Sequence, residues 1–418
     1  MRTRANFVVC MLIYLLFMLS GCWNQTEPKD YAVADSALYD LTEDGKYKVT
    51  IEYMDFSGGS SAGQSASGGG IVSFITETAE GTSVREATAK ISMTIDKKVF
   101  GGHNYVRLFS EAMAKKGIGE LLDYFMRSAL TDETPYMVIL KGDDTNKIYT
   151  ASLGLSDTIG TYYINLEKNE PETISRGIFI TTLDFIKDYY REGKQPVAGT
   201  LELMESEEKT GAGAGDTSSS GSSGSEGASS SGDSNKKNKI VYQGLAAFKD
   251  LKLVGYLDGI ETRAYNFLTN NMGTTYIPIS LGNDTITLRV ISSSAKIKTS
   301  IKDNQVSVDI NVKVGTKIST FGGDQNIMDK SVQDEMEQTF NAQIKGELEA
   351  AIKKVQQEFK SDIFGFGAYF HEQHPNEWRQ IKSTWDDAYF PEAVVNVSVN
   401  SVIYRVGQLT EALIEESS

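Results

Sequence analysis

The stretches QVSVDINVKV, residues 305–314, and SVQDEMEQTFNAQIKGELEAAIKKVQQEFK, residues 331–360, decide the expected fold. In the first stretch, apolar and polar residues alternate with a period of two, which is typical of a strand with one buried face. In the second, apolar residues recur every three or four positions and form one stripe along a long helix. The members of the stripe are Val332, Met336, Phe340, Ile344, Leu348, Ile352, Val355 and Phe359.

Further alternating stretches, residues 286–290 and 395–403, lie before and after these two and predict additional strands. Strands, a long helix and a final strand together indicate an α+β domain. We therefore predict a C-terminal domain, residues 284–418, in which one long helix packs on an antiparallel sheet.

The sequence before residue 284 also predicts mixed α and β structure. We therefore expect two to three domains over the 418 residues of the chain. We predict an N-terminal α+β domain at residues 22–194 and a middle domain at residues 195–283. A hairpin is expected around the turn Asp44-Gly45, and a break between two helices at Gly117. The other expected elements are helices at 82–92, 183–190 and 262–271 and strands at 105–109, 136–140, 200–204 and 240–248.

Residues 211–234 consist almost entirely of Gly, Ser and Ala. Such a segment has no apolar surface to bury, so we expect it to be disordered. It separates two predicted strands, 200–204 and 240–248, and we interpret it as an insertion between two strands of one sheet.

The N-terminus has the pattern of a bacterial export signal, predicted at residues 1–21. Arg2 and Arg4 precede the apolar run 7–19, which is too short to cross a bilayer comfortably. Leu19-Ser20-Gly21-Cys22 then resembles the lipobox of bacterial lipoproteins, in which the cysteine receives a diacylglycerol and, after cleavage, an N-acyl group. The alternative is an ordinary secretory signal with a chance cysteine.

Charge and cysteine content narrow the possible partners. Removing Arg2 and Arg4 takes the formal charge from −15 to −17, and a chain this acidic is repelled by nucleic acid and anionic lipid. The two cysteines are Cys10, inside the predicted signal, and Cys22. The exported part therefore has no disulfide, and we expect membrane attachment through Cys22 or through a protein partner.

No motif indicates catalysis, and we predict no catalytic residue, metal or cofactor. A G-x-S-x-G pattern at residues 59–63 lies in a Gly/Ser-rich loop, without the flanking strand and helix that a nucleophile elbow needs. Gly193-Lys194 is not a phosphate loop, because Asp188 stands where that motif needs glycine. His371 and His374 could form a weak metal site, but Pro375 ends the helix there, and with His103 they are more simply surface or cap residues.

An aromatic and glycine cluster follows the long helix, and two interpretations of it are open. Its candidate residues are Phe364, Gly365, Phe366, Gly367, Trp378 and Trp385. The favoured interpretation is a core that locks the long helix to the segment after it, with glycines permitting close packing. The second is a partly exposed aromatic surface that contacts a partner.

These same residues carry a family resemblance. The run Ser361-Asp362-Ile363-Phe364-Gly365-Phe366-Gly367, followed by the pairs His374-Pro375 and Glu377-Trp378, resembles the Ger(x)C family, the lipoprotein C subunits of spore germinant receptors. Residues 247–257 and 261–263, the Cys22-Trp23 start and, more weakly, 102–127 resemble it too. The insertion 211–234 and the loop 57–70 depart from the family pattern.

The resemblance implies a function. Family members are anchored by lipid to the outer face of the spore inner membrane and assemble with integral-membrane A and B subunits. The resemblance implies a non-enzymatic subunit of a nutrient germinant receptor that is needed for spore germination. It also implies a fold of three mixed α and β domains.

Two other functions are weighed against this one. A lipid-anchored extracytoplasmic solute-binding protein would occupy the same compartment, but the sequence shows no two βαβ lobes around a cleft. A cell-wall hydrolase would need a paired-carboxylate or zinc site, which the sequence does not present.

Overall fold

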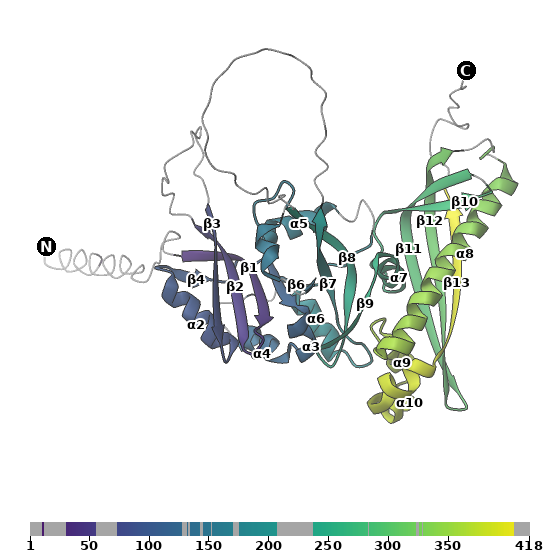
Figure 1. Ribbon diagram of the computed structural model, residues 1–418. Coiled ribbons are helices and arrows are strands. Elements are labelled where there is room, and N and C mark those ends of the chain that lie inside the picture. The colour runs from purple at the N-terminus through teal and green to yellow at the C-terminus, as the bar shows by residue number, and fades with distance from the viewer. Residues whose placement is uncertain are drawn as a thin grey trace, which may run out of the picture.

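The structure is a computed structural model, and it describes residues 11, 31–55, 73–127, 132, 134–142, 145–151, 153–169, 175–206, 237–282, 284–322, 326–327 and 329–404 (Figure 1). Residues 1–21 apart from Met11, the candidate lipidation site Cys22, the pattern at 59–63 and the insertion 211–234 lie outside the described residues. The predictions made for them therefore stay predictions. Within the described residues, no helix is both long and apolar enough to cross a membrane.

Nine strands form the first sheet, in the order β3-β2-β1-β5-β6-β7-β8-β9, with β4 paired to β1. The central strands β1, β5, β6 and β7 run parallel, and antiparallel strands extend the sheet on both sides. The strands are β1 Tyr31–Leu41, β2 Tyr47–Asp55, β3 Ser73–Gly81, β4 Lys98–Phe100, β5 Val106–Ser110, β6 Tyr136–Lys141, β7 Val197–Ser206, β8 Lys237–Lys249 and β9 Lys252–Leu257.

Helices cover both faces of this sheet, as parallel strands require because both of their faces are buried. On one face lie α2 (Val84–Thr94), α3 (Glu111–Lys116), α4 (Gly119–Arg127) and α6 (Thr182–Tyr190). On the other, a second apolar cluster joins the sheet to α5 (Ile159–Asn169) and the 3₁₀ helix η2 (Thr145–Thr150).

Four strands form the second sheet, in the order β10-β11-β12-β13 (Figure 1). They are β10 Thr275–Leu281, β11 Asp284–Lys302, β12 Gln305–Gly322 and β13 Val394–Ile403. Helix α8 (Lys330–Lys354), extended by a π-helical turn at Val355–Phe359, packs along one face, and its predicted apolar stripe is buried except at Val332, which is half-buried. The predicted C-terminal sheet packed by one long helix is confirmed.

One strand pair in this sheet differs from the prediction. β12 and β13 are parallel, whereas β10, β11 and β12 are antiparallel neighbours. The reason is that α8 carries the chain back along the sheet between β12 and β13, and such a crossover returns the next strand in the same direction.

Helix α7 (Gly259–Leu268) lies between the two sheets and contacts β8, β11 and α8. The Arg263 guanidinium, which is 3% exposed, meets both carboxylate oxygens of Glu347 on α8 at 2.6 and 2.7 Å. A single apolar cluster runs through both sheets.

The remaining elements follow α8 and are α9 Phe366–Gln373, α10 Pro375–Ile381, η5 Lys382–Thr384, η6 Trp385–Tyr389 and α11 Phe390–Glu392.

Most of the predicted local elements are present. β1 and β2 form the expected hairpin, with Gly45 at φ +79°, and α3 ends at Gly117 as expected.

β3, β4, α5 and β10 were not predicted. β10 contains Pro278, which lowers strand propensity in the interior of a sheet but is tolerated on this edge strand, where Pro278 is exposed.

The predicted domain limits can be compared with the pairing of strands in the two sheets. β6 and β7, on opposite sides of the limit at residues 194 and 195, are paired neighbours in the first sheet. β10, inside the predicted middle domain, belongs to the second sheet. The division into three domains stays a prediction.

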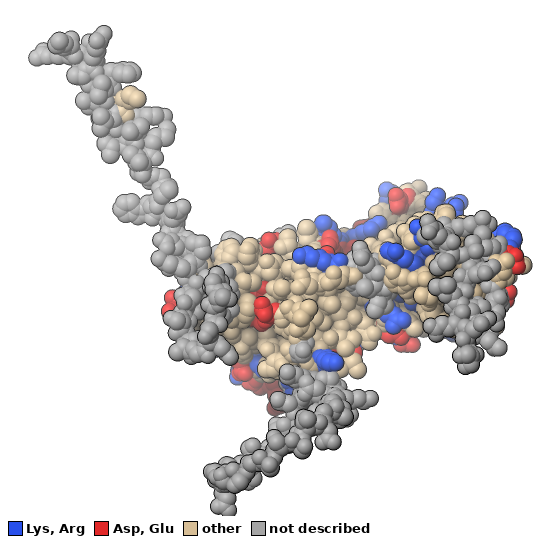
Figure 2. All heavy atoms as spheres, turned by 90° about the horizontal axis from the view of Figure 1, so that it is seen from above, with Lys and Arg blue, Asp and Glu red and all other residues tan. Residues whose placement is uncertain are grey.

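Charge is distributed unevenly over the surface. Seen from above, Figure 2 shows Lys and Arg side chains gathered toward the second-sheet end, at the right, and few charged side chains over the middle of the molecule. The net negative charge of the chain is therefore a poor guide to local surface potential.

β7 and β8 pair antiparallel from Val197↔Ala247 to Ser206↔Lys237, as an insertion between two strands of one sheet requires. Deleting residues 211–234 would leave six residues between these strands, which is enough to close a hairpin. We expect the melting temperature to change by less than about 2 °C, measured by circular dichroism on the full chain. A drop of more than about 8 °C would show that the segment packs on the fold.

Candidate functional site

The predicted aromatic cluster lies inside the molecule, between the two sheets. Phe364, Phe366, Trp378 and Trp385 are all at most 3% exposed. The rings of Phe364 and Phe366 stack at 5.3 Å, and those of Trp378 and Trp385 meet edge to face at 5.4 Å. This burial supports the interpretation as a core that locks the long helix and leaves little aromatic surface for a partner.

The two glycines of the cluster allow close contact between backbones. Gly365 has φ +77°, a conformation that favours glycine. A Cβ on Gly367 would lie 2.7 Å from the Trp385 indole nitrogen and 2.8 Å from the Cα of Gly193. Gly193 belongs to the loop after α6, so these glycines bring that loop against the N-terminal turn of α9, and the Ala368 N–H donates to the Gly193 carbonyl at 3.0 Å.

The centre of this site is the buried carboxylate of Asp362, which is 0% exposed. It accepts hydrogen bonds from the backbone N–H groups of Gly365, Phe366 and Gly367 at 2.8, 3.0 and 2.6 Å. The Trp385 indole N–H donates to it at 2.9 Å. Burial, and then the nearby charge of Asp386, raise the pKa of Asp362 to about 7, against the effect of these donors.

Asp386 and Gln195 link this turn to the first sheet. The Asp386 carboxylate accepts from the Asp362 N–H at 2.9 Å and from the Gln195 side-chain amide at 2.7 Å. The Gln195 backbone N–H donates to the Asp362 carbonyl at 2.9 Å. Burial raises the pKa of Asp386 as well, while its bond from Gln195 acts in the opposite direction.

Two further polar contacts border this junction. Glu192 accepts from the Trp378 indole N–H and from Lys382, each at 2.9 Å. Lys249 at the end of β8 meets Asp387 at 2.6 Å. Between these contacts lies an open cleft of about 430 Å³, lined by residues of the stretches 189–195, 249–250 and 378–387.

The three histidines do not come together. His371 stacks on Trp378 at 5.5 Å and lies 3.6 Å from Glu192, whereas the His374 Nε2 faces the Thr299 carbonyl at 2.8 Å. His103 lies in the loop between β4 and β5. Within the described ranges, no group of three or more His, Cys, Asp or Glu side chains is arranged to hold a metal ion.

From the sequence, Asp362 was named only as part of a motif and was not predicted to be the centre of the site. No structural role was predicted for Gly193, Gln195 or Asp386. The signal at Asp362 was an acid at the start of a glycine-containing turn, where a carboxylate can accept several N–H groups. Gln195 carried no comparable signal, because its partner Asp386 is 191 residues away.

A second buried acid pair lies in the first sheet and was not predicted. Glu52 on β2 accepts from Ser36 at 2.9 Å and from the Ile159 N–H at 3.2 Å, and Asp35 accepts from the Gly160 N–H at 2.8 Å. The charge of Asp35 acts on Glu52 and adds to the rise in the pKa of Glu52. Burial raises the pKa of both, that of Glu52 to about 7.

The fold and this junction define a multi-domain α+β protein in which two sheets are joined by a buried polar turn. Residues 24–203 match the model of the spore germination protein N-terminal domain, and residues 243–407 match the model described as spore germination B3/GerAC like, C-terminal. The chain belongs to the Ger(x)C family, and so has a role in spore germination.

Relatives match over nearly their whole length. Spore germination protein KC of Bacillus subtilis (strain 168) is 23% identical over 412 residues, covering 97% of this chain and 96% of the relative. Spore germination protein B3 of the same organism is 24% identical over 393 residues, covering 93% and 94%. The crystal structure of the GerBC protein has the same fold, with a TM-score of 0.53 and 19% identity over 88% of this chain and 96% of that one.

Gly367→Ala tests the close contact at the junction. We expect it to destabilise the protein by about 1–3 kcal/mol, because the new Cβ overlaps the Trp385 indole and the Gly193 backbone. Gly346→Ala on α8 is the control, since its Cβ meets nothing within 4 Å and should stabilise the helix by about 0.5–1 kcal/mol. Urea unfolding measures both, and equal effects would contradict the contact.

Raising the pH from about 5 to about 8 should destabilise the protein through Glu52. Its folded pKa of about 7 exceeds that of an exposed glutamate, so its stabilising effect is complete below the unfolded pKa and is lost as the pH rises through 7. Glu52→Gln should flatten the pH dependence of the unfolding free energy by up to about 1.4 kcal/mol per pH unit. The exposed Glu80→Gln is the control, and an unchanged slope in Glu52→Gln would refute this assignment.

Proposed function

We propose that this protein is a lipid-anchored, non-enzymatic subunit of a nutrient germinant receptor, held by Cys22 at the outer face of the spore inner membrane. In this proposal it assembles with integral-membrane A and B subunits. The observation that carries the proposal is the pair of family matches, which together span most of the chain after the predicted signal.

Two features of the chain support the anchored, non-enzymatic assignment. The lipobox-like Leu19-Ser20-Gly21-Cys22 supplies a single modifiable cysteine after the signal. The buried polar groups at the junction have structural partners: Asp362 holds a turn, and Asp386 and Gln195 tie that turn to the first sheet. A carboxylate satisfied by N–H donors inside a fold stabilises the turn and is poorly placed to exchange protons with a substrate.

Cys22→Ala in spores tests the anchor. We expect the protein to be lost from the inner-membrane fraction and the response to at least one nutrient to fall sharply, while germination by a non-nutrient trigger continues. Cys10→Ala, inside the predicted signal, is the matched control and should leave both unchanged. Full membrane retention and a normal response of Cys22→Ala would show that the lipid anchor is dispensable.

A further inference from the structure

The second sheet has one covered face and one open face. Helix α8 packs on the covered face, where alternate residues of β11 and β12, such as Ile297 and Ile310, are buried. The residues between them point to the opposite side, because successive side chains of a strand alternate between faces, and most of them are exposed. We call this side the open face, and its central residues are Lys296, Lys298, Asp309, Asn311, Lys313 and Ser398.

The strands of this sheet are cationic. Their acidic residues are Asp284 and Asp309, and their basic residues are Arg289, Lys296, Lys298, Lys302, Lys313 and Lys317. The chain as a whole has 56 acidic and 41 basic residues, so the open face has the opposite sign to the net charge. Figure 2 shows Lys and Arg side chains gathered toward this end of the molecule.

The pairing of the strands places like charges close together. Arg289 on β11 lies directly opposite Lys317 on β12. Lys296 and Lys298 are successive side chains on the open face, about 7 Å apart along β11. Like charges that lie opposite each other destabilise a sheet. An anion bound to the open face would remove this cost.

The protein itself does not neutralise these cations. Among the described residues, none of the six forms an ion pair. Asp309 lies opposite Lys298 but accepts a hydrogen bond from the Asn396 side-chain amide at 2.8 Å. The Asn311 amide donates to the Ser398 hydroxyl at 3.0 Å. The polar groups between the lysines therefore bond to one another, and the ammonium groups are available to an external anion.

The arrangement of these cations fits an extended anionic surface. Arg289 and Lys302 lie on the same strand and are about 40 Å apart along it, so a small anion would meet only a few of the charges. Protein interfaces usually have an apolar centre in which lysine is depleted, whereas the centre of the open face consists of lysine, serine and asparagine. Lipid head groups require only that positive charge lies close to them.

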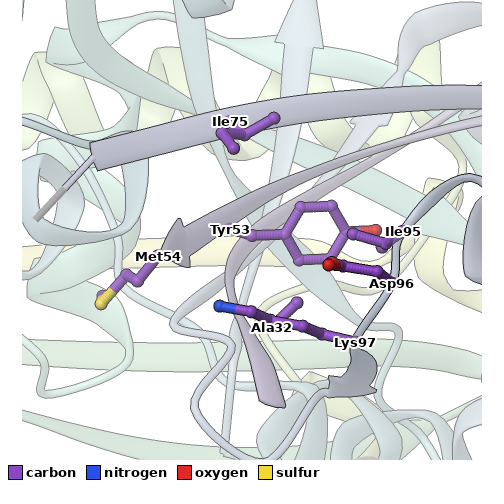
Figure 3. Close-up of a pocket in the computed structure, with 7 residues that line it drawn as sticks. All are labelled: Ala32, Tyr53, Met54, Ile75, Ile95, Asp96 and Lys97. Atoms are coloured by element: carbon purple, nitrogen blue, oxygen red, sulfur yellow. The ribbon is translucent and has the colours of Figure 1, made fainter. Parts of the chain in front are cut away.

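The proposed anchor lies at the other end of the described chain. β1 begins at Tyr31, and the chain between Cys22 and Tyr31 can span at most about 30 Å. Beside the start of β1 lies a cavity of about 60 Å³, lined by Ala32, Tyr53, Ile95 and their neighbours (Figure 3). This cavity is too small to hold an acyl chain, so a lipid contact made by the fold is better sought at a charged surface.

We propose that the open face lies on anionic lipid head groups of the membrane to which Cys22 ties the chain. The proposal rests on the lipid anchor proposed above, which brings the bilayer within reach. Figure 1 shows the second sheet at the opposite end of the molecule from β1 to β3, so the two attachments hold the protein lengthwise along the bilayer. The net charge predicts repulsion from anionic lipid, but the charges within about 10 Å of the head groups dominate because salt screens the rest.

Vesicle sedimentation of the mature chain tests this face. The chain is made from Trp23 onward, so it carries neither signal nor lipid and still contains every described residue except Met11. The probes are vesicles of phosphatidylcholine with about 30% phosphatidylglycerol and vesicles of phosphatidylcholine alone. We expect binding to the anionic vesicles to be at least about tenfold tighter, and this difference to disappear in about 0.5 M NaCl because salt screens the charges.

A double variant locates the binding. Lys296→Gln combined with Lys298→Gln should weaken binding to the anionic vesicles by about 25-fold, since each lysine near the lipid surface contributes about fivefold. Lys345→Gln combined with Lys353→Gln is the matched control, because both lysines are exposed on α8, on the other side of the sheet. The control should bind as the parent does, and urea unfolding establishes that both variants are folded.

Equal binding to the two kinds of vesicle, or to neither, would overturn the proposal, as would equal losses in the two double variants. A third contrary result is a variant of Lys296 and Lys298 that binds vesicles normally but no longer co-purifies with the A and B subunits. The open face would then be a protein interface. The chain in the vesicle assay carries no lipid, so its result is independent of the Cys22→Ala experiment in spores, and either proposal can fail alone.

Discussion

The buried carboxylate of Asp362 is the interaction on which the rest of the structure depends. Moving a carboxylate out of water costs several kcal/mol unless hydrogen bonds replace the lost hydration. Three backbone N–H groups and the Trp385 indole provide those bonds, so the turn after the long helix can adopt few other conformations. That turn places Gly367 against Gly193 and aligns Asp386 with Gln195, which joins the second sheet to the first.

Helix α6 connects the core of the first sheet with the junction. Its first residue, Thr182, accepts a hydrogen bond from the buried Arg107 on β5. The loop after its last residue carries Glu192, Gly193 and Gln195 into the junction. One helix therefore contacts both the central strands of the first sheet and the junction, in a family whose role is spore germination.

The sequence predicted the regular elements well and the polar contacts poorly, for different physical reasons. The alternation in β12 and the stripe in α8 are local patterns, and burial of one face follows from them directly. The aromatic cluster was found because its residues are close in sequence. The contacts of Gln195 with Asp386 and of Glu192 with Trp378 span 191 and 186 residues, and no local pattern marks such pairs.

The sequence by itself determined the α+β class, the long helix on its sheet, the insertion between paired strands and the family, because each rests on periodicity, composition or a contiguous motif. Only the tertiary structure decided that β13 runs parallel to β12, that the aromatic cluster is buried between the sheets, and that Gln195 meets Asp386 at the junction. These features depend on which surfaces meet after the chain has folded. Side-chain packing and the dehydration of polar groups determine that choice, and neither is encoded at a single stretch of sequence.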